Sequence, residues 1–216
     1  MLLRLAQIWR VSSSKNMPLK VLSLFVHLLS ALVRKIQNLT LSRRGYKFSS
    51  EAYRLATINL DLLKISGIKG IILDLDNTII SEDDRYLSPG AEAWIEQAKL
   101  EGFKFFILSN GKRRYRVKYW THRLNIAAIN PAKKPFPFAF QKAIAYMQLK
   151  PNQVVVIGDS RHTDMLGAWL VGCPSIQVAT LPHPFRWWEK LLGKRVQTPY
   201  PSEDELWEFN ASQISL

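Results

Sequence analysis

The chain has 216 residues, which is enough for one sizeable hydrophobic core with extensions. Its formal net charge of +13 indicates a polyanionic partner: nucleic acid, an anionic membrane or phosphorylated substrates. The single cysteine, Cys173, excludes a disulfide within the chain and is compatible with a reducing compartment.

The first 50 residues carry most of the net positive charge, because they contain nine lysines and arginines and no acid precedes Glu51. The most apolar stretch, 21–33, is shorter than the ~20 residues of a membrane-spanning helix. From Lys20 to Gln37 the polar residues are spaced three or four apart, so on a helix they form one narrow stripe opposite a wide apolar face. A basic, acid-free amphipathic helix is typical of a segment that lies in a membrane interface.

Two other interpretations of this segment stay open. The helix could dock on the chain's own domain, or the segment could be a targeting peptide, since it is rich in Arg and Ser and lacks acids. Met17 could also be the true start, which would remove the preceding residues and keep the main helix.

Beyond residue 51, short apolar runs alternate with amphipathic stretches. The expected strands are 67–75, 103–110, 126–130, 153–159 and 174–180. The expected helices are 88–102, 112–125, 135–149 and 164–172, the first with Ser88 as N-cap and Pro89 in its first turn. This alternation predicts an α/β fold, a Rossmann-like parallel sheet with helices on both faces.

Polar residues follow the expected strands at the points where they end. Asp74, Ser109 and Asp159 each terminate an apolar run, and Asp76 and Asp164 lie close behind two of them. In an open parallel sheet the carboxyl ends of the strands share one edge, where ligands bind. Carboxylates gathered there would raise each other's pKa unless a cation compensates them, and carboxylate oxygens with room for water suit Mg²⁺.

The same edge offers the groups that a phosphate ester needs. A hydroxyl and a lysine from "AKKP" beside a magnesium site make a pocket for phosphate. One carboxylate can then act as a nucleophile and form an aspartyl-phosphate. A neighbouring carboxylic acid can protonate the leaving alcohol and later activate water.

Four stretches resemble the motifs of the haloacid dehalogenase-like (HAD) phosphohydrolases. They are "DLDNT" at 74–78, the strand that ends in Ser109, the lysine before Pro135, and "GDSRHTD" at 158–164. The resemblance covers residues 66–180, in order and with each motif at an expected strand end. It implies the HAD fold.

The resemblance also implies a role for each matched residue. Asp74 would be the nucleophile, and Asp76 the general acid and base. The Mg²⁺ would be bound by Asp74, the backbone carbonyl of Asp76, Asp159 and Asp164. Ser109, Asn110 and Lys134 would bind the phosphoryl group. Thr78 would bind it too or would shape the loop after the first strand.

Lys134 is preferred to Lys133 for the phosphate site because the lysine of this family commonly precedes a proline, here Pro135. The spacing of the motifs leaves no room for an inserted cap domain, as in capless subfamily III. An open site of this kind suits a phosphate displayed on something large.

Among capless members the chain resembles the phosphatidylglycerophosphate phosphatase branch, of YqeG type. The resembling stretches are "GIKGIILDLDNT", "AKKP", "VVVIGDSRHTDMLGA" and "PHPFRWWEKLLGKR", whereas Ser160 departs from the Gln or Arg frequent in that branch. The resemblance implies a Mg²⁺-dependent phosphate monoesterase that converts phosphatidylglycerophosphate to phosphatidylglycerol at a membrane surface.

We therefore expect three parts: a basic amphipathic helical extension at 1–47, a HAD-like phosphatase domain at 48–182, and a basic-aromatic segment with an acidic tail at 183–216. The expected partners are an anionic phospholipid membrane and a phosphorylated lipid, on the cytoplasmic face of the membrane, or in a mitochondrion or plastid if the N-terminus is a targeting segment. Two alternatives stay open: a phosphatase of nucleic-acid ends or other macromolecules, and a non-catalytic membrane-associated interaction protein. No feature of the sequence indicates an oligomeric state.

Overall fold

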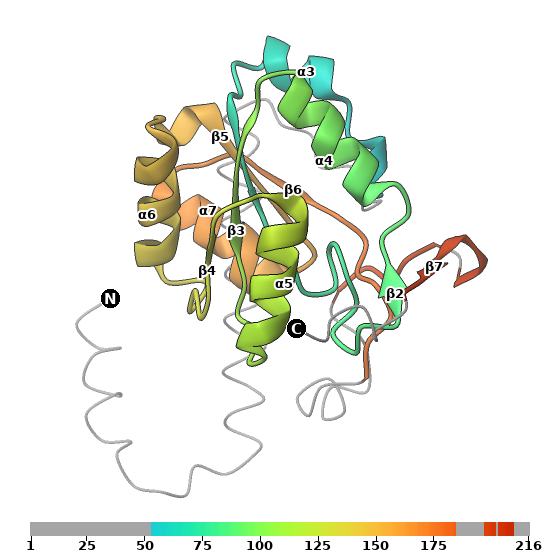
Figure 1. Ribbon diagram of the computed structural model, residues 1–216. Coiled ribbons are helices and arrows are strands. Elements are labelled where there is room, and N and C mark those ends of the chain that lie inside the picture. The colour runs from blue at the N-terminus through green and yellow to red at the C-terminus, as the bar shows by residue number, and fades with distance from the viewer. Residues whose placement is uncertain (1–52, 185–196, 202, 210–216) are drawn as a thin grey trace, which may run out of the picture. The chain divides into compact units, whose positions relative to one another are not determined.

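The structure is a computed structural model that describes residues 53–184, 197–201 and 203–209, all within one compact unit (Figure 1). The expected helix from Lys20 to Gln37 and most of the basic-aromatic segment therefore lie outside the described residues. The division of the chain at 47 and 182 stays a prediction. In the described ranges, no helix combines the length and hydropathy needed to cross a bilayer.

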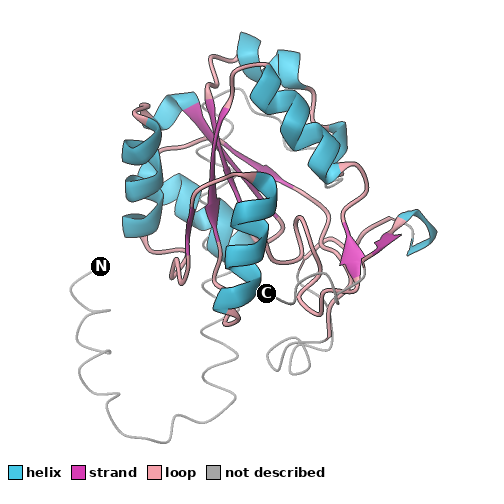
Figure 2. Ribbon diagram, in the orientation of Figure 1, coloured by secondary structure: helices cyan, strands magenta, loops and turns pink. Residues whose placement is uncertain are grey.

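A five-stranded parallel sheet forms the centre of the unit (Figure 2). Its strands, in spatial order, are β4 (Ala128–Ile129), β3 (Lys104–Leu108), β1 (Gly70–Leu73), β5 (Val154–Gly158) and β6 (Ser175–Gln177). β1 pairs with both β3 and β5, so the chain crosses over on either side of its central strand. All the expected strands are therefore present, and the predicted α/β fold is confirmed.

Helices cover both faces of this sheet. They are α3 (Leu60–Ile65), α4 (Ala91–Leu100), α5 (Arg114–Leu124), α6 (Pro137–Met147) and α7 (Leu166–Val171), with a π-helical turn at Arg161–Met165 before α7. Short 3-10 turns lie at Leu55–Thr57, Pro151–Gln153 and Glu203–Glu205, and the two-residue strands β2 (Tyr86–Leu87) and β7 (Trp207–Glu208) pair antiparallel.

The continuous apolar runs of the strands follow from this two-sided cover. Ile71 and Leu73 belong to the hydrophobic cluster that includes α4 and α5, whereas Ile72 belongs to the cluster on the α6 and α7 side. Successive side chains of a strand point to opposite faces. Each position of β1 is therefore buried, and an alternating polar pattern would have left charges inside the core.

The expected start of α4 was wrong. Its N-cap is Gly90, in the left-handed region at φ 71°, and Ser88 makes no side-chain cap. The backbone carbonyl of Ser88 instead accepts a hydrogen bond from the N–H of Ala91 (3.1 Å). Pro89 and Gly90 thus form a tight turn before the helix, and a glycine adopts its positive φ without a Cβ clash.

The connections near the strand ends are short. Between β1 and β3 the chain forms only a loop with β2 and then α4, and between β3 and Lys134 it forms only α5 and β4. Within residues 53–184, no inserted domain stands over the carboxyl ends of the strands.

Candidate active site

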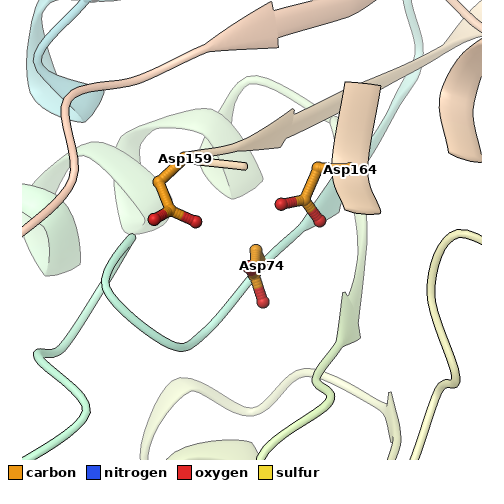
Figure 3. Close-up of side chains that lie close together, drawn as sticks. All are labelled: Asp74, Asp159 and Asp164. Atoms are coloured by element: carbon orange, nitrogen blue, oxygen red, sulfur yellow. The ribbon is translucent and has the colours of Figure 1, made fainter. Parts of the chain in front are cut away.

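Three buried carboxylates meet at the carboxyl edge of the sheet (Figure 3). Asp74 follows β1, Asp159 follows β5, and Asp164 lies on the π-helical turn. One oxygen from each lies within 4.8 Å of the others. The parallel register sets Leu73 opposite Ile157, so the first two of these aspartates leave neighbouring strands close together. We call these three residues the acidic triad.

Lys134 reaches into the acidic triad from the loop after β4. Its Nζ lies 2.6 Å from Oδ1 of Asp74 and 2.7 Å from Oδ1 of Asp164. The backbone of Lys134 is fixed by Asn110, whose Oδ1 accepts from the Lys134 N–H (2.9 Å) and whose Nδ2 donates to its carbonyl (3.0 Å). Lys133 is exposed, so Lys134 is the lysine of "AKKP" that contacts the carboxylates.

Burial dominates the electrostatics of this cluster. It raises the pKa of Asp74 to about 8, with the charge of Asp164 adding to the effect and that of Lys134 opposing it. Burial likewise raises the pKa of Asp164, against the charge of Lys134. Burial alone would lower the pKa of Lys134, but the two carboxylates outweigh it and the pKa is raised.

The ammonium of Lys134 thus contacts two of the three buried carboxylates. The donor set consists of carboxylate oxygens alone, the ligand type that hard divalent cations such as Mg²⁺ prefer. The residues present thus fit a divalent cation held by Asp74, Asp159 and Asp164.

The carboxylates of Asp159 and Asp164 are held in place by hydrogen bonds from neighbouring groups. Thr180 Oγ1 donates to Oδ2 of Asp159 (2.7 Å), and the N–H of Ser160 donates to Oδ2 of Asp164 (3.2 Å). A Cβ at Gly158 would lie 2.5 Å from Cγ of Asp164. Glycine is therefore required at the end of β5 for Asp164 to approach the strand.

Asp76 is not one of the three carboxylates of the acidic triad. Its Oδ2 accepts a hydrogen bond from Ser109 Oγ (2.7 Å), which brings the loops after β1 and β3 together. A Cβ at Gly111 would lie 2.9 Å from the same oxygen, so this loop also needs a glycine. The predicted acid–base role of Asp76, and its contact with the metal through the backbone carbonyl, stay predictions.

Thr78 links two strand ends. It is buried, and its Oγ1 accepts a hydrogen bond from the N–H of Asp159 (3.2 Å). This contact joins the loop after β1 to the end of β5. A contact with phosphate by Thr78, Ser109 or Asn110 stays a prediction.

Arg116 is a site residue that the sequence analysis missed. It lies on α5, is only 2 % exposed, and forms ion pairs with Asp76 and Asp84. Its Nη2 also donates to the backbone carbonyl of Ser81 (2.7 Å). The signal in the sequence was its helical spacing: Arg116 lies four residues before the fully buried Trp120, so the two share a face of α5.

Residues 79–172 match the sequence model of the hydrolase family described as haloacid dehalogenase-like hydrolase. The matched range begins after Asp76 and includes Ser109, Lys134, Asp159 and Asp164.

The chain is also similar to two named phosphatases. It is 43% identical over 110 residues to the probable phosphatase YqeG of Bacillus subtilis, covering 51% of this chain and 63% of that protein. It is 28% identical over 99 residues to the glyceraldehyde 3-phosphate phosphatase of Pyrococcus furiosus, covering 41% and 40%. The chain thus spans less than two thirds of the length of either relative.

A solved structure described as a predicted phosphoglycolate phosphatase from Haemophilus somnus is 17% identical, covers 53% of this chain and 85% of its own, and has a TM-score of 0.43.

Proposed function

Because the chain contains a haloacid dehalogenase-like domain that resembles YqeG, we propose that it is a phosphate monoester hydrolase that works through an aspartyl-phosphate. The observation that carries the proposal is the contact of Lys134 with Asp74 inside the acidic triad. A nucleophilic carboxylate needs its charge compensated as it approaches a phosphate dianion, and an ammonium at 2.6 Å offers that.

In the first step an oxygen of Asp74 attacks phosphorus and the ester P–O bond breaks. Asp76 gives its proton to the leaving alcohol, so that no free alkoxide forms. Lys134, Ser109 and Asn110 bind the phosphoryl oxygens. Asp74, Asp159 and Asp164 would hold a divalent cation, which would supply the remaining charge neutralisation.

In the second step Asp76, now a carboxylate, accepts a proton from water. The oxygen of that water attacks phosphorus, inorganic phosphate leaves, and Asp74 is restored as a carboxylate. The contact of Asp76 with Ser109 in the free protein keeps the acid–base group beside a predicted phosphate ligand.

We propose Mg²⁺ as the cation and phosphatidylglycerophosphate as the substrate, at the surface of a membrane that contains anionic phospholipid. Two observations support a large, surface-displayed substrate. No inserted domain covers the strand ends within 53–184, and Lys112 and Arg114 lie exposed beside the loop after β3. The charge of the first 50 residues supports an anionic surface.

The test is an assay of the purified full chain on phosphatidylglycerophosphate in vesicles, a 5′-phosphorylated oligonucleotide and a soluble aryl phosphate, each with Mg²⁺ or chelator. We expect turnover of the lipid and the aryl ester with Mg²⁺ only, and none by the Asp74→Asn variant. Turnover of the oligonucleotide but not of the lipid would identify the substrate as a nucleic-acid end and not a lipid. Inactivity on all three would favour a non-catalytic protein.

A further inference from the structure

Two large apolar side chains stand exposed beside the lysine of the candidate active site. Phe136, the N-cap of α6, is 68 % exposed, and Phe138, in its first turn, is 66 % exposed. Both follow Lys134 within the same short segment. α6 begins at the edge of the sheet where β3 and β4 end (Figure 1). Because the two phenylalanines lie at the start of α6, they belong to the side of the unit that carries the acidic triad.

Two acid-free segments meet near the start of α6, because Asn110 in the first is hydrogen-bonded to the backbone of Lys134 in the second. Neither 110–118 nor 131–150, the segments that begin at the ends of β3 and β4, contains an aspartate or glutamate. Lys112 and Arg114 are exposed in the first. In the second, Nζ of Lys142 lies 4.5 Å from the ring centroid of Phe138. The phenylalanines and these cations together form what we call the aromatic rim.

Two other exposed apolar residues lack this setting. Ile65 and Leu100, at the C-terminal ends of α3 and α4, are 81 % and 85 % exposed. They lie at the opposite edge of the sheet, beside Glu101, which pairs with Lys64. Single exposed aliphatic residues of this kind are ordinary on a protein surface.

We propose that the aromatic rim docks on an anionic phospholipid bilayer, with Phe136 and Phe138 inserted at the level of the headgroups. The inference rests on the proposed function and states how the candidate active site reaches a lipid substrate. A phenyl ring has no polar atom to satisfy, so it gains by leaving water for the acyl boundary. Lys112, Arg114 and Lys142 complement the phosphates around it. In this orientation a phosphate monoester on a lipid headgroup faces Lys134 and Asp74.

The experiment uses the full chain with one introduced cysteine. The native Cys173 is the only cysteine and is buried, so a thiol placed at position 136 by Phe136→Cys can be labelled selectively with an environment-sensitive fluorophore. Leu100→Cys, at the opposite edge, is the matched control. Each labelled protein is mixed with vesicles of phosphatidylcholine alone or with phosphatidylglycerol.

We expect a blue shift and brightening at position 136 with the anionic vesicles, little change with the neutral ones, and no change at position 100. Equal responses at both positions, or none at 136, would overturn the proposal. So would a label at 136 that is already shielded without vesicles, because another part of the chain would then cover the rim. A response to an oligonucleotide and not to vesicles would assign the rim to base stacking instead.

A second measurement avoids the label. In the Phe136→Ser/Phe138→Ser variant, co-sedimentation with anionic vesicles should weaken at least ~10-fold, whereas Ile65→Ser/Leu100→Ser should bind as the native chain does. The ratio of lipid turnover to soluble aryl phosphate turnover should fall only in the first variant. Unchanged sedimentation of a folded Phe136→Ser/Phe138→Ser protein would contradict the proposal.

The two proposals fail in different ways. If the proposed function is wrong, the label at 136 still responds to anionic vesicles while no phosphate ester is hydrolysed. If the aromatic rim does not dock, lipid phosphate is hydrolysed without any response of the label.

Discussion

Nζ of Lys134 lies 2.6 Å from Oδ1 of Asp74, and this contact joins two segments that are far apart in the sequence. The lysine belongs to the loop after β4, an outer strand, whereas the aspartate follows the central strand β1. Both side chains are buried, so the ion pair replaces contacts with water that each group has lost. Lys134 is also paired with Asp164, so losing the lysine would remove the cation from two buried carboxylates at once.

Replacing Lys134 with Met should therefore damage both activity and stability. We expect a kcat on aryl phosphate about 10²–10³-fold lower, because one charge on the phosphoryl group is no longer compensated. In chelator the free energy of unfolding should fall by about 3–5 kcal/mol, the usual cost of removing one partner of a buried ion pair. Kinetics and urea denaturation measure the two effects.

Lys133→Met is the matched control, since its side chain is exposed one residue earlier. It should leave kcat nearly unchanged and the free energy of unfolding within about 0.5 kcal/mol of that of the native chain. A larger loss of aryl phosphate turnover in Lys133→Met than in Lys134→Met would show that Lys133, and not Lys134, serves the phosphate site.

Replacing Asp74 with Asn should abolish turnover, because an amide oxygen does not attack phosphorus to give a stable acyl-phosphate. The fold should persist, since the two side chains are nearly isosteric and one of the mutually repelling acids is removed. Mass spectrometry of the native chain after brief incubation with substrate should show a phosphate adduct that Asp74→Asn lacks. Measurable turnover by the purified variant would exclude Asp74 as the nucleophile.

The same substitution should change how stability depends on pH. Burial raises the pKa of Asp74 from 3.8 to about 8, so between these values the folded chain holds a proton that the unfolded chain has released. Stability in chelator should then fall as pH rises from about 5 to 8. The Asp74→Asn variant should show a shallower fall, measured as Tm at several pH values. Parallel curves would show that Asp74 does not bind this proton.

Mg²⁺ should stabilise the native chain and support turnover, and excess chelator should silence it. At a concentration of 100 times its Kd, a bound cation adds about 2.7 kcal/mol to the free energy of unfolding. Asp159→Asn should lose most of this gain, because it removes one of three ligand carboxylates. Ca²⁺ should support turnover poorly, since its longer bonds and looser geometry misplace an in-line attack. Full activity in chelator would rule out the metal site.

Local patterns in the sequence were sufficient to predict the strands and the acids at their ends. The strands are continuous apolar runs because both faces of the sheet are covered, and a parallel sheet brings Asp74 and Asp159 to one edge. The pairing of β2 with β7 was not predictable in this way. Two-residue strands have no periodicity, and these two come from distant parts of the chain.

Arg116 escaped prediction for a related reason. The stretch "GKRRYRVKYW" contains five cations, and apart from the helical spacing of Arg116 and Trp120 nothing in the sequence distinguishes Arg116 from the other four. Which cation is buried depends on the acids that tertiary structure brings to it. Asp76 and Asp84 come from the loop after β1, and the packing of α5 against that loop pairs Arg116 with both of them.

Arg116 is expected to position Asp76 for acid–base catalysis. Its guanidinium pairs with Asp76 and Asp84 and donates to the carbonyl of Ser81, so several of its donors are used from one rigid plane. A lysine offers a single ammonium and cannot make these contacts together. Arg116→Lys should therefore lower kcat on aryl phosphate about 10-fold or more, within the range of acid–base contributions, and change KM little.

The decisive comparison combines stability and catalysis in three variants. Arg116→Met should lose about 3–5 kcal/mol of unfolding free energy, because Asp84 is left buried with fewer partners. Arg116→Lys should keep more of that stability while kcat stays low. Lys118→Met, an exposed position on the same helix, should change neither quantity. If Arg116→Lys unfolds at the native urea concentration and also turns over at the native rate, Arg116 serves only as a cation in the core and does not orient Asp76.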